Sequence, residues 1–316
     1  MRMLETPILS TALLMLLPVL MSSCAHKPIE CPSTETTIEV LFEWDNVRQP
    51  EVDGMTIFFY PTDGKGRIWR YDVSGSEGGP VEIPSGTYRM IACNNDVPGI
   101  ALEDTGNSSA IRAVATRRIG DGVYAGNGML YSAVVDRLEV TPCGVRYTTS
   151  DGTMKECGKR FVRCRPDSFA TCYTIALSNV TGLENVRGVS SVLTPVSSGV
   201  FLGNGLCTDS NGSLYMPLAI DRREKSLVGM SCAFGTDRED FSAYNMSVRI
   251  DTADGKILER TIELCPDNVN IVSPHNVIII IRDFNIPGGT PSGDVGGFDA
   301  AVDGWNVVEI ELESGI

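Results

Sequence analysis

The chain has 316 residues, of which 42% are hydrophobic and 21% charged, and its formal net charge is −14. These proportions are typical of a folded globular protein and exclude an intrinsically disordered chain. The excess of carboxylates also excludes a nucleic-acid-binding role, because an acidic surface repels the phosphate backbone.

The first 24 residues predict an export signal. Arg2 precedes an apolar run from Ile8 to Leu20, which is too short to span a bilayer stably. Ser22 and Ser23 then stand directly before Cys24, a pattern that resembles the lipobox of bacterial lipoproteins. The resemblance implies that residues 1–23 are removed and that Cys24 becomes an acylated N-terminus. The alternative is an ordinary signal peptide in which Cys24 carries no lipid.

Residues 24–36 contain two prolines after Cys24 and little apolar content, so we interpret them as a tether. Several acyl chains on one cysteine anchor a protein stably, whereas a single chain does not. We therefore expect a soluble domain held by lipid at the outer membrane, facing the cell surface; the sequence leaves the periplasmic face open as an alternative.

Period-two alternation of apolar residues predicts strands from Thr37 onward. Gly54–Tyr60 and Arg67–Val73 flank an Asp-Gly turn and predict a hairpin. Further strands are expected within the first domain, which we place at residues 37–145; they lie at Thr87–Cys93, Ile111–Ile119, Leu130–Val135 and Leu138–Val140.

A boundary is expected at residues 146–167, which we interpret as a linker, or as a last strand followed by a linker. This region holds a basic cluster, for which we favour a solvated strand face over a binding site. The cluster consists of Lys155, Lys159, Arg160, Arg163 and Arg165.

Residues 168–316 form the second expected domain, with alternating or apolar strands throughout. Val277–Ile281 is apolar at every position, which predicts a strand buried on both faces. The other strands are expected at Phe169–Leu177, Val186–Thr194, Gly199–Leu202, Ser213–Ala219, Ser226–Phe234, Asn245–Asp251, Ile257–Glu263, Asn276–Phe284 and Trp305–Leu312. No segment of twelve or more residues has helical periodicity. The sequence thus predicts an all-β fold of two tandem sandwiches.

Ten cysteines are present, and nine remain if Cys24 is acylated, so at least one thiol is unpaired within a monomer. One or two disulfides around Cys143–Cys172 are compatible with export. Cys93, Cys172 and Cys265 lie in apolar strands, and burial as small apolar residues is an equally good interpretation. The absence of any Cys-x-x-Cys pair argues against zinc.

No catalytic, metal or cofactor site is predicted. The two histidines, His26 and His275, have no nucleophile or ligand neighbours in sequence, and no hydrolase or nucleotide-binding motif occurs. Three aspartates in a glycine-rich loop do not have EF-hand spacing, and three tryptophans that could stack on a sugar lie in strand patterns and are expected in the core. These residues are Asp294, Asp299, Asp303, Trp44, Trp69 and Trp305.

Taken together, Thr37–Trp44, Gly54–Pro61, Ile68–Gly75, Val81–Asn95 and Gly297–Ile310 resemble the anchor-type accessory lipoproteins of fimbrillin (type V) pilus systems in Bacteroides-type bacteria. The resemblance implies two transthyretin-like or immunoglobulin-like sandwiches, lipid attachment at Cys24, and pilin subunits or other surface proteins as partners. It implies no enzymatic activity and no cofactor.

Pilus assembly by strand addition would use an open sheet edge or a lent strand. The last predicted strand is the candidate for lending, and the alternative is that it completes its own sandwich. Its residues are Val307, Val308, Glu309, Ile310, Glu311 and Leu312. A second functional hypothesis is a surface lipoprotein that binds a glycan or host ligand through loops.

Overall fold

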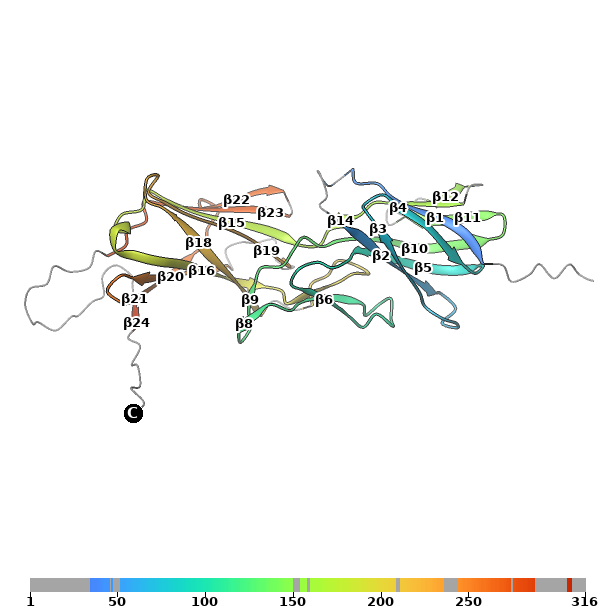
Figure 1. The fold of residues 1–316 in the computed structure, drawn as a ribbon, viewed down its shortest axis with the longest axis horizontal. Helices are drawn as coiled ribbons and strands as arrows, with labels where there is room; N and C mark the ends of the chain where they lie inside the picture. The colour runs from blue at the N-terminus through green and yellow to red at the C-terminus, as the bar shows by residue number, and fades with distance from the viewer. Residues whose placement is uncertain are drawn as a thin grey trace, which may run out of the picture.

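The computed structural model describes residues 35–45, 47, 52–149, 154–157, 160–208, 211–235, 244–273, 275–287 and 306–308. The described chain consists of β-strands with one short 3-10 helix, Leu183–Asn185. Two β-sandwiches follow one another along the long axis of the molecule (Figure 1). The predicted all-β fold is confirmed.

The first sandwich packs a small sheet against a large one. Its strands are β1 (Thr36–Phe42), β2 (Gly54–Pro61), β3 (Trp69–Ser74), β4 (Gly78–Ile83), β5 (Gly86–Asn94), β10 (Tyr131–Thr141), β11 (Gly144–Thr149), β12 (Met154–Cys157), β13 (Phe161–Cys164) and β14 (Asp167–Ser168). The small sheet has the order β13-β1-β4, and the large sheet has the order β12-β11-β10-β5-β2-β3, with β14 beside β10.

Alternation along the strands builds the first core. Ile38, Val40 and Phe42 of β1 point inward and are buried, whereas Thr37 and Glu39 are exposed. The three buried residues pack against inward-pointing residues of the large sheet. This packing of one apolar face explains why the segment forms a strand, because strands are stabilised by side-chain packing on the pleated surface. The large-sheet residues in this core include Ile57, Phe59, Met90 and Val135.

A third layer covers the opposite face of the large sheet. It consists of β6 (Ile100–Glu103), β7 (Arg112–Ala115) and β17 (Gly199–Phe201), in the order β17-β7-β6. Phe58, Tyr60, Ile91 and Cys93 point into this layer and are buried as well. Because β17 comes from the second half of the sequence, the two halves of the chain share this core.

The second sandwich is a sheet that continues from one layer into the next. Its strands are β15 (Thr171–Ser178), β16 (Val186–Val196), β18 (Gly212–Asp221), β19 (Ser226–Ala233), β20 (Asn245–Thr252), β21 (Ile257–Glu263), β22 (Val269–Ser273), β23 (Asn276–Arg282) and β24 (Asn306–Val308). The order is β22-β23-β15-β19-β18-β16-β20-β21-β24, and the core lies between its two parts. A hairpin of β8 (Arg118–Gly120) and β9 (Val123–Ala125) reaches over from the first half and pairs with β18.

The structure differs from the sequence prediction in several places. The segment 146–167, expected to be a linker, contributes strands to both sheets of the first sandwich; β13 pairs in parallel with β1, a contact between residues about 120 positions apart. The expected strand Ile111–Ile119 is divided between β7 and β8, and β4 and β22 were not predicted. Leu130–Val135 and Leu138–Val140 are one strand, interrupted by a bulge. The division into two domains stays a proposal.

Candidate interaction surface

Exposed apolar side chains gather on one sheet of the second sandwich. Of the large apolar residues that are exposed in the described chain, four lie on β19 and β22. They are Val228 and Met230, exposed to 42% and 71%, and Ile271 and Val272, exposed to 55% and 56%. Val228 and Met230 share the outward face of β19, whereas Ile271 lies opposite the core-facing Val277 and so belongs to the other face of the sheet.

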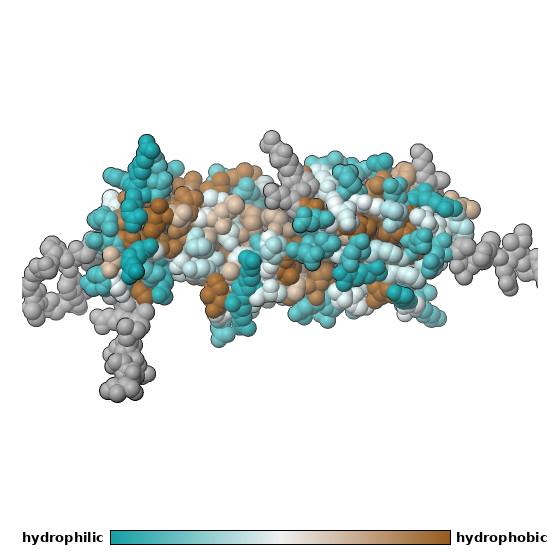
Figure 2. All heavy atoms as spheres, viewed as in Figure 1, coloured by the Kyte–Doolittle hydropathy of each residue, from teal (hydrophilic) through white to brown (hydrophobic). Residues whose placement is uncertain are grey.

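The strand register places the side chains of β19 in continuous rows with those of β15 and β23. One row contains Ile280, Ala176 and Val228, and the next contains Ile278, Thr174 and Met230. We call these six outward-pointing residues the open face. In Figure 2, brown and pale-brown atoms gather over the region where β15, β22 and β23 lie in Figure 1.

The open face corrects the prediction for Val277–Ile281. Val277 and Ile279 are buried in the core, as expected, but Ile278 and Ile280 on the other side remain partly exposed. The apolar run is therefore covered by the described chain on one face and only partly covered on the other.

The same sheet ends in an edge strand. β22 pairs with β23 on one side, and no described strand pairs with it on the other. Four of its five residues are exposed. An edge of this kind presents unpaired backbone N–H and C=O groups, which can pair with a further strand.

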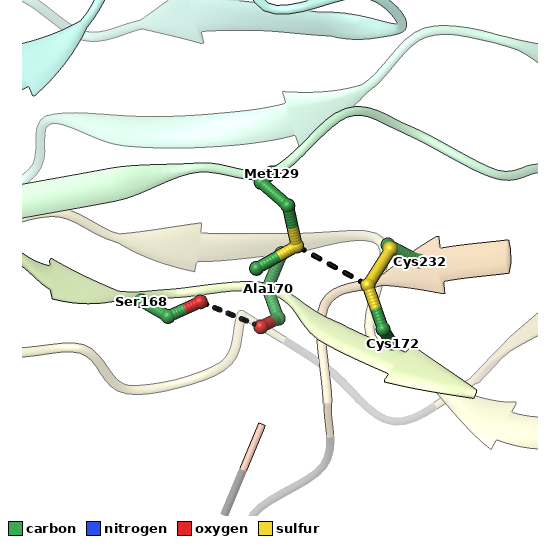
Figure 3. Close-up of a disulfide and its surroundings, with 5 residues drawn as sticks. All are labelled: Met129, Ser168, Ala170, Cys172 and Cys232. Atoms are coloured by element: carbon green, nitrogen blue, oxygen red, sulfur yellow. Dashed lines mark hydrogen bonds between the residues drawn. A yellow bond between two sulfur atoms is a disulfide. The ribbon is translucent and has the colours of Figure 1, made fainter. Parts of the chain in front are cut away.

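The end of the open face nearest the first sandwich is covered by the chain itself. Cys172 and Cys232, opposite each other on β15 and β19, form a disulfide, and the Sδ of Met129 lies 3.2 Å from the Sγ of Cys172 (Figure 3). Asn127 donates a backbone hydrogen bond to the carbonyl of Cys232 at 2.9 Å. The approach is close, because a Cβ on Gly126 would lie 1.8 Å from the hydroxyl of Ser231.

Arg89 adds polar contacts between the halves of the chain. Its guanidinium donates to the carbonyls of Gly203 at 2.7 Å and Ser108 at 3.1 Å, and it forms an ion pair with Asp136. Together with the shared third layer, this contact joins β5 of the first sandwich to the loop after β17. The two sandwiches are thus connected by strands, side chains and a common core.

Other described cysteines are divided between buried and exposed positions. Burial raises the pKa of the Cys93 thiol to about 12 and that of Cys164 still further, so both are neutral and behave as small apolar residues. The expected burial of Cys93 is confirmed. Cys172 is instead disulfide-bonded, and Cys265, expected in the core, is exposed.

A cleft of about 380 Å³ lies beside the junction and is lined by polar and apolar residues, including Asp53, Asn95, Asp96 and Met129. Trp44, a candidate sugar platform, is near this region; it packs edge-on against Tyr131 and donates its indole N–H to the carbonyl of Ser76. Trp44 therefore has a structural role in this arrangement.

The remaining candidate residues are placed as follows. Trp69 lies on β3 beneath the guanidinium of Arg67, and His275 lies 4.0 Å from Asp167. In the basic cluster, Arg163 and Arg165 form ion pairs with Glu43, which lower the pKa of that carboxyl. His26, Asp294, Asp299, Asp303, Trp305 and the side chains of Lys155 and Lys159 lie outside the described residues.

Val307 and Val308 lie on β24, which pairs antiparallel with β21 through Leu258 and Ile257. Glu309, Ile310, Glu311 and Leu312 are outside the described residues, as is Cys24. Strand lending and lipid attachment stay proposals. Within the described chain, no three His, Cys, Asp or Glu side chains could hold a metal ion, and no helix is long and apolar enough to cross a bilayer.

Comparison with known protein families identifies the family to which the chain belongs. A family model described as a domain of unknown function, DUF5119, matches residues 23–217, which is more than half of the sequence. The chain belongs to the DUF5119 family. The match extends through the first sandwich and the third layer and ends in β18 of the second sandwich, so it includes the strands that join the two halves.

A relative of this DUF5119 chain in Bacteroides ovatus is named as a fimbrium anchoring subunit, Fim4B. The two are 22% identical over 200 residues, which is 62% of this chain and 56% of the relative. The alignment thus spans little more than half of the relative's length. It confirms the resemblance to fimbrial anchor proteins.

Two solved structures share the fold. A protein from Bacteroides ovatus described as an adhesin superposes with a TM-score of 0.62 and 18% identity, covering 81% of this chain and 94% of that one. A protein from Bacteroides thetaiotaomicron described as polysaccharide-binding superposes with a TM-score of 0.52 and 12% identity, covering 79% and 92%. At these identities the superpositions establish the architecture of the DUF5119 chain rather than its ligand.

Proposed function

We propose that this protein is a non-enzymatic accessory subunit of a fimbrium and that a lipid at Cys24 tethers it to the outer membrane. The protein would hold filament subunits there through protein–protein contact. The observation that carries the proposal is the open face with its edge strand, on the sandwich that follows the tethered one. The similarity to a fimbrium anchoring subunit supports it.

The architecture suits a load-bearing attachment. Cys24 precedes β1 by twelve residues, so the lipid would hold the first sandwich, while the open face belongs to the second (Figure 1). A pull on a partner bound there would pass through the shared third layer, the β9–β18 pairing and the Arg89 contacts. These links make the two sandwiches one connected body.

The test is a Cys24→Ser substitution in the bacterium that makes the protein. We expect the protein to leave the membrane fraction and fimbriae to be shed into the medium, because the tether no longer holds their base. Cys31→Ser is the matched control, since it removes a nearby cysteine without altering the lipobox. Retention of filaments on Cys24→Ser cells, or on cells that lack the protein altogether, would overturn the proposal.

A further inference from the structure

Two arginines of the basic cluster join the first described strand, β1, to β13, the strand that pairs with it in parallel. Arg163 lies on β13, and Arg165 follows the end of this strand. Both form ion pairs with Glu43, directly after β1, at distances of 2.7 Å and 3.5 Å. Arg165 also pairs with Asp45 at 3.2 Å. The ion pairs therefore fasten the end of β1 to the end of β13.

β1 runs from the far end of the first sandwich toward the junction with the second (Figure 1). Its ladder with β13 begins at Glu39 and is closed by a hydrogen bond from the N–H of Glu43 to the carbonyl of Cys164 at 2.9 Å. Just beyond it, Trp44 packs against Tyr131, which lines the cleft beside the junction. A pull on the N-terminal tether would therefore act along β1, away from the junction.

Such a pull loads β1 in shear. β1 is the central strand of the small sheet, β13-β1-β4, so it is hydrogen-bonded on both sides. The second sandwich follows in the chain after β13, and β13 ends at the junction. A load between the tether and the second sandwich therefore pulls the two parallel strands from opposite ends. Because ladder hydrogen bonds run between strands, this load acts on all of them together rather than one after another.

The core also opposes any sliding of β1. Ile38, Val40 and Phe42 are buried on one face of the strand, whereas Thr37 and Glu39 are exposed on the other. A slip by one residue, about 3.3 Å, would exchange the two faces and bring the carboxylate of Glu39 into the core. β1 therefore cannot yield to a load through small changes of register.

We infer that β1 and β13 form a mechanical clamp, which keeps the first sandwich closed while a filament pulls against the lipid. The inference rests on the proposed function, because the direction of the load follows from an anchor at Cys24 and a partner on the second sandwich. The ion pairs of Glu43 lock the clamp at the junction end, where β1 and β13 would first have to separate under a sideways load.

Single-molecule force spectroscopy on the purified protein tests the clamp. One handle is attached at position 167, between β13 and the second sandwich, where the side chain of Asp167 is 59% exposed. The other handle is attached either at position 24, before β1, or at position 45, after it, where Asp45 is 62% exposed. The first arrangement shears the β1–β13 ladder, and the second opens it from one end. We expect a higher unfolding force in the first arrangement.

Glu43→Gln keeps the shape of the side chain but removes the charge that binds both arginines. It should raise the unfolding rate at constant force about threefold when the handles are at positions 24 and 167. Glu139→Gln is the matched control. The side chain of Glu139 is 27% exposed, against 25% for Glu43, and also pairs with two arginines, Arg137 and Arg146, but it lies on β10, outside the β1–β13 ladder. Its unfolding rate should not change.

Equal unfolding forces in the two arrangements would overturn the inference, as would an equal change in unfolding rate for Glu43→Gln and Glu139→Gln. The measurement uses the purified protein without cells or filaments, so its result is independent of the proposed function. That function fails separately if cells lacking the protein retain their filaments.

Discussion

Two strands with almost the same apolar pattern end in different surroundings. β2 reads Gly-Met-Thr-Ile-Phe-Phe-Tyr-Pro, and all of its residues except Pro61 are buried, because one sheet packs on Ile57 and Phe59 and the third layer packs on Phe58 and Tyr60. β23 reads Asn-Val-Ile-Ile-Ile-Ile-Arg and is covered on one face. An apolar run thus indicates that both faces of a strand will be covered, but not whether the chain itself supplies the cover.

The largest difference in the free energy of unfolding is expected when a side chain on the second face of each strand is truncated to alanine. Phe58→Ala should lower the free energy of unfolding by about 3–5 kcal/mol, because the ring is buried under the third layer and its removal leaves a cavity. Ile280→Ala should cost less than about 1.5 kcal/mol, because water already reaches that side chain. Urea denaturation of the purified full-length protein measures both.

Phe59→Ala is the control for this comparison, since Phe59 faces the first core and is fully buried. It should cost as much as Phe58→Ala. If Phe58→Ala proved as mild as Ile280→Ala, the third layer would not cover β2 in solution, and the contrast between the two strands would disappear.

The next effect concerns the covered end of the open face. Replacing both Cys172 and Cys232 with alanine should lower the free energy of unfolding by about 2–4 kcal/mol, because the disulfide closes a loop across 60 residues of the unfolded chain. Cys143→Ala, which removes an exposed thiol, should change little. Equal stability of the double variant and the oxidised protein would indicate that Met129 and its neighbours hold β15 and β19 without the covalent link.

The sequence predicts strands well where a single period of two is sufficient. β1, β15 and β20 lie close to their expected bounds, because each has one apolar face that a sandwich must bury. The covering of the second face could not be predicted, because it depends on pairings such as β7 with β17, which join residues far apart in the chain. The same limit applies to the disulfide, whose partners are separated by 60 residues.

Only part of the candidate surface could be predicted from the sequence. The unbroken apolar run Val277–Ile281 drew attention to β23, but β22 was missed because Val-Asn-Ile-Val-Ser is short and its exposed apolar side chains do not alternate with polar ones. An edge is a property of sheet order, and sheet order is not encoded in local periodicity. The prediction that Cys24 bears lipid has a local motif, and it stays a prediction.

Alkaline titration tests whether the third layer shields β5 from water. Burial raises the pKa of Cys93 from its ordinary value of 9.0 to about 12, so the unfolded chain releases this proton first as the pH rises. The contribution of the protonated Cys93 thiol to the free energy of unfolding is fully present below pH 9. It is lost between pH 9 and 12, at up to about 1.4 kcal/mol per pH unit. Cys93→Ala should have a correspondingly shallower decline in stability between pH 9 and 12.

Buried Cys164 contributes a slope of the same sign in both proteins, so the difference between them isolates Cys93. Identical slopes would mean that water reaches Cys93 through the third layer. In that case the second face of the large sheet would resemble the open face, and the comparison between β2 and β23 would be weakened.

The smallest effect on stability should come from the open face itself. Met230 is 71% exposed, so Met230→Ser should change the free energy of unfolding by no more than about 0.5 kcal/mol, whereas Met216→Ser, at a buried position of the neighbouring strand, should cost several times more. The same Met230→Ser variant should hold fewer fimbriae on cells, because it removes apolar area from the partner's side of the sheet alone. If Met230→Ser instead destabilised the isolated protein by more than about 2 kcal/mol, the chain would already cover this face. Loss of filaments without loss of stability is the result that distinguishes a surface kept open for a partner from an incompletely covered core.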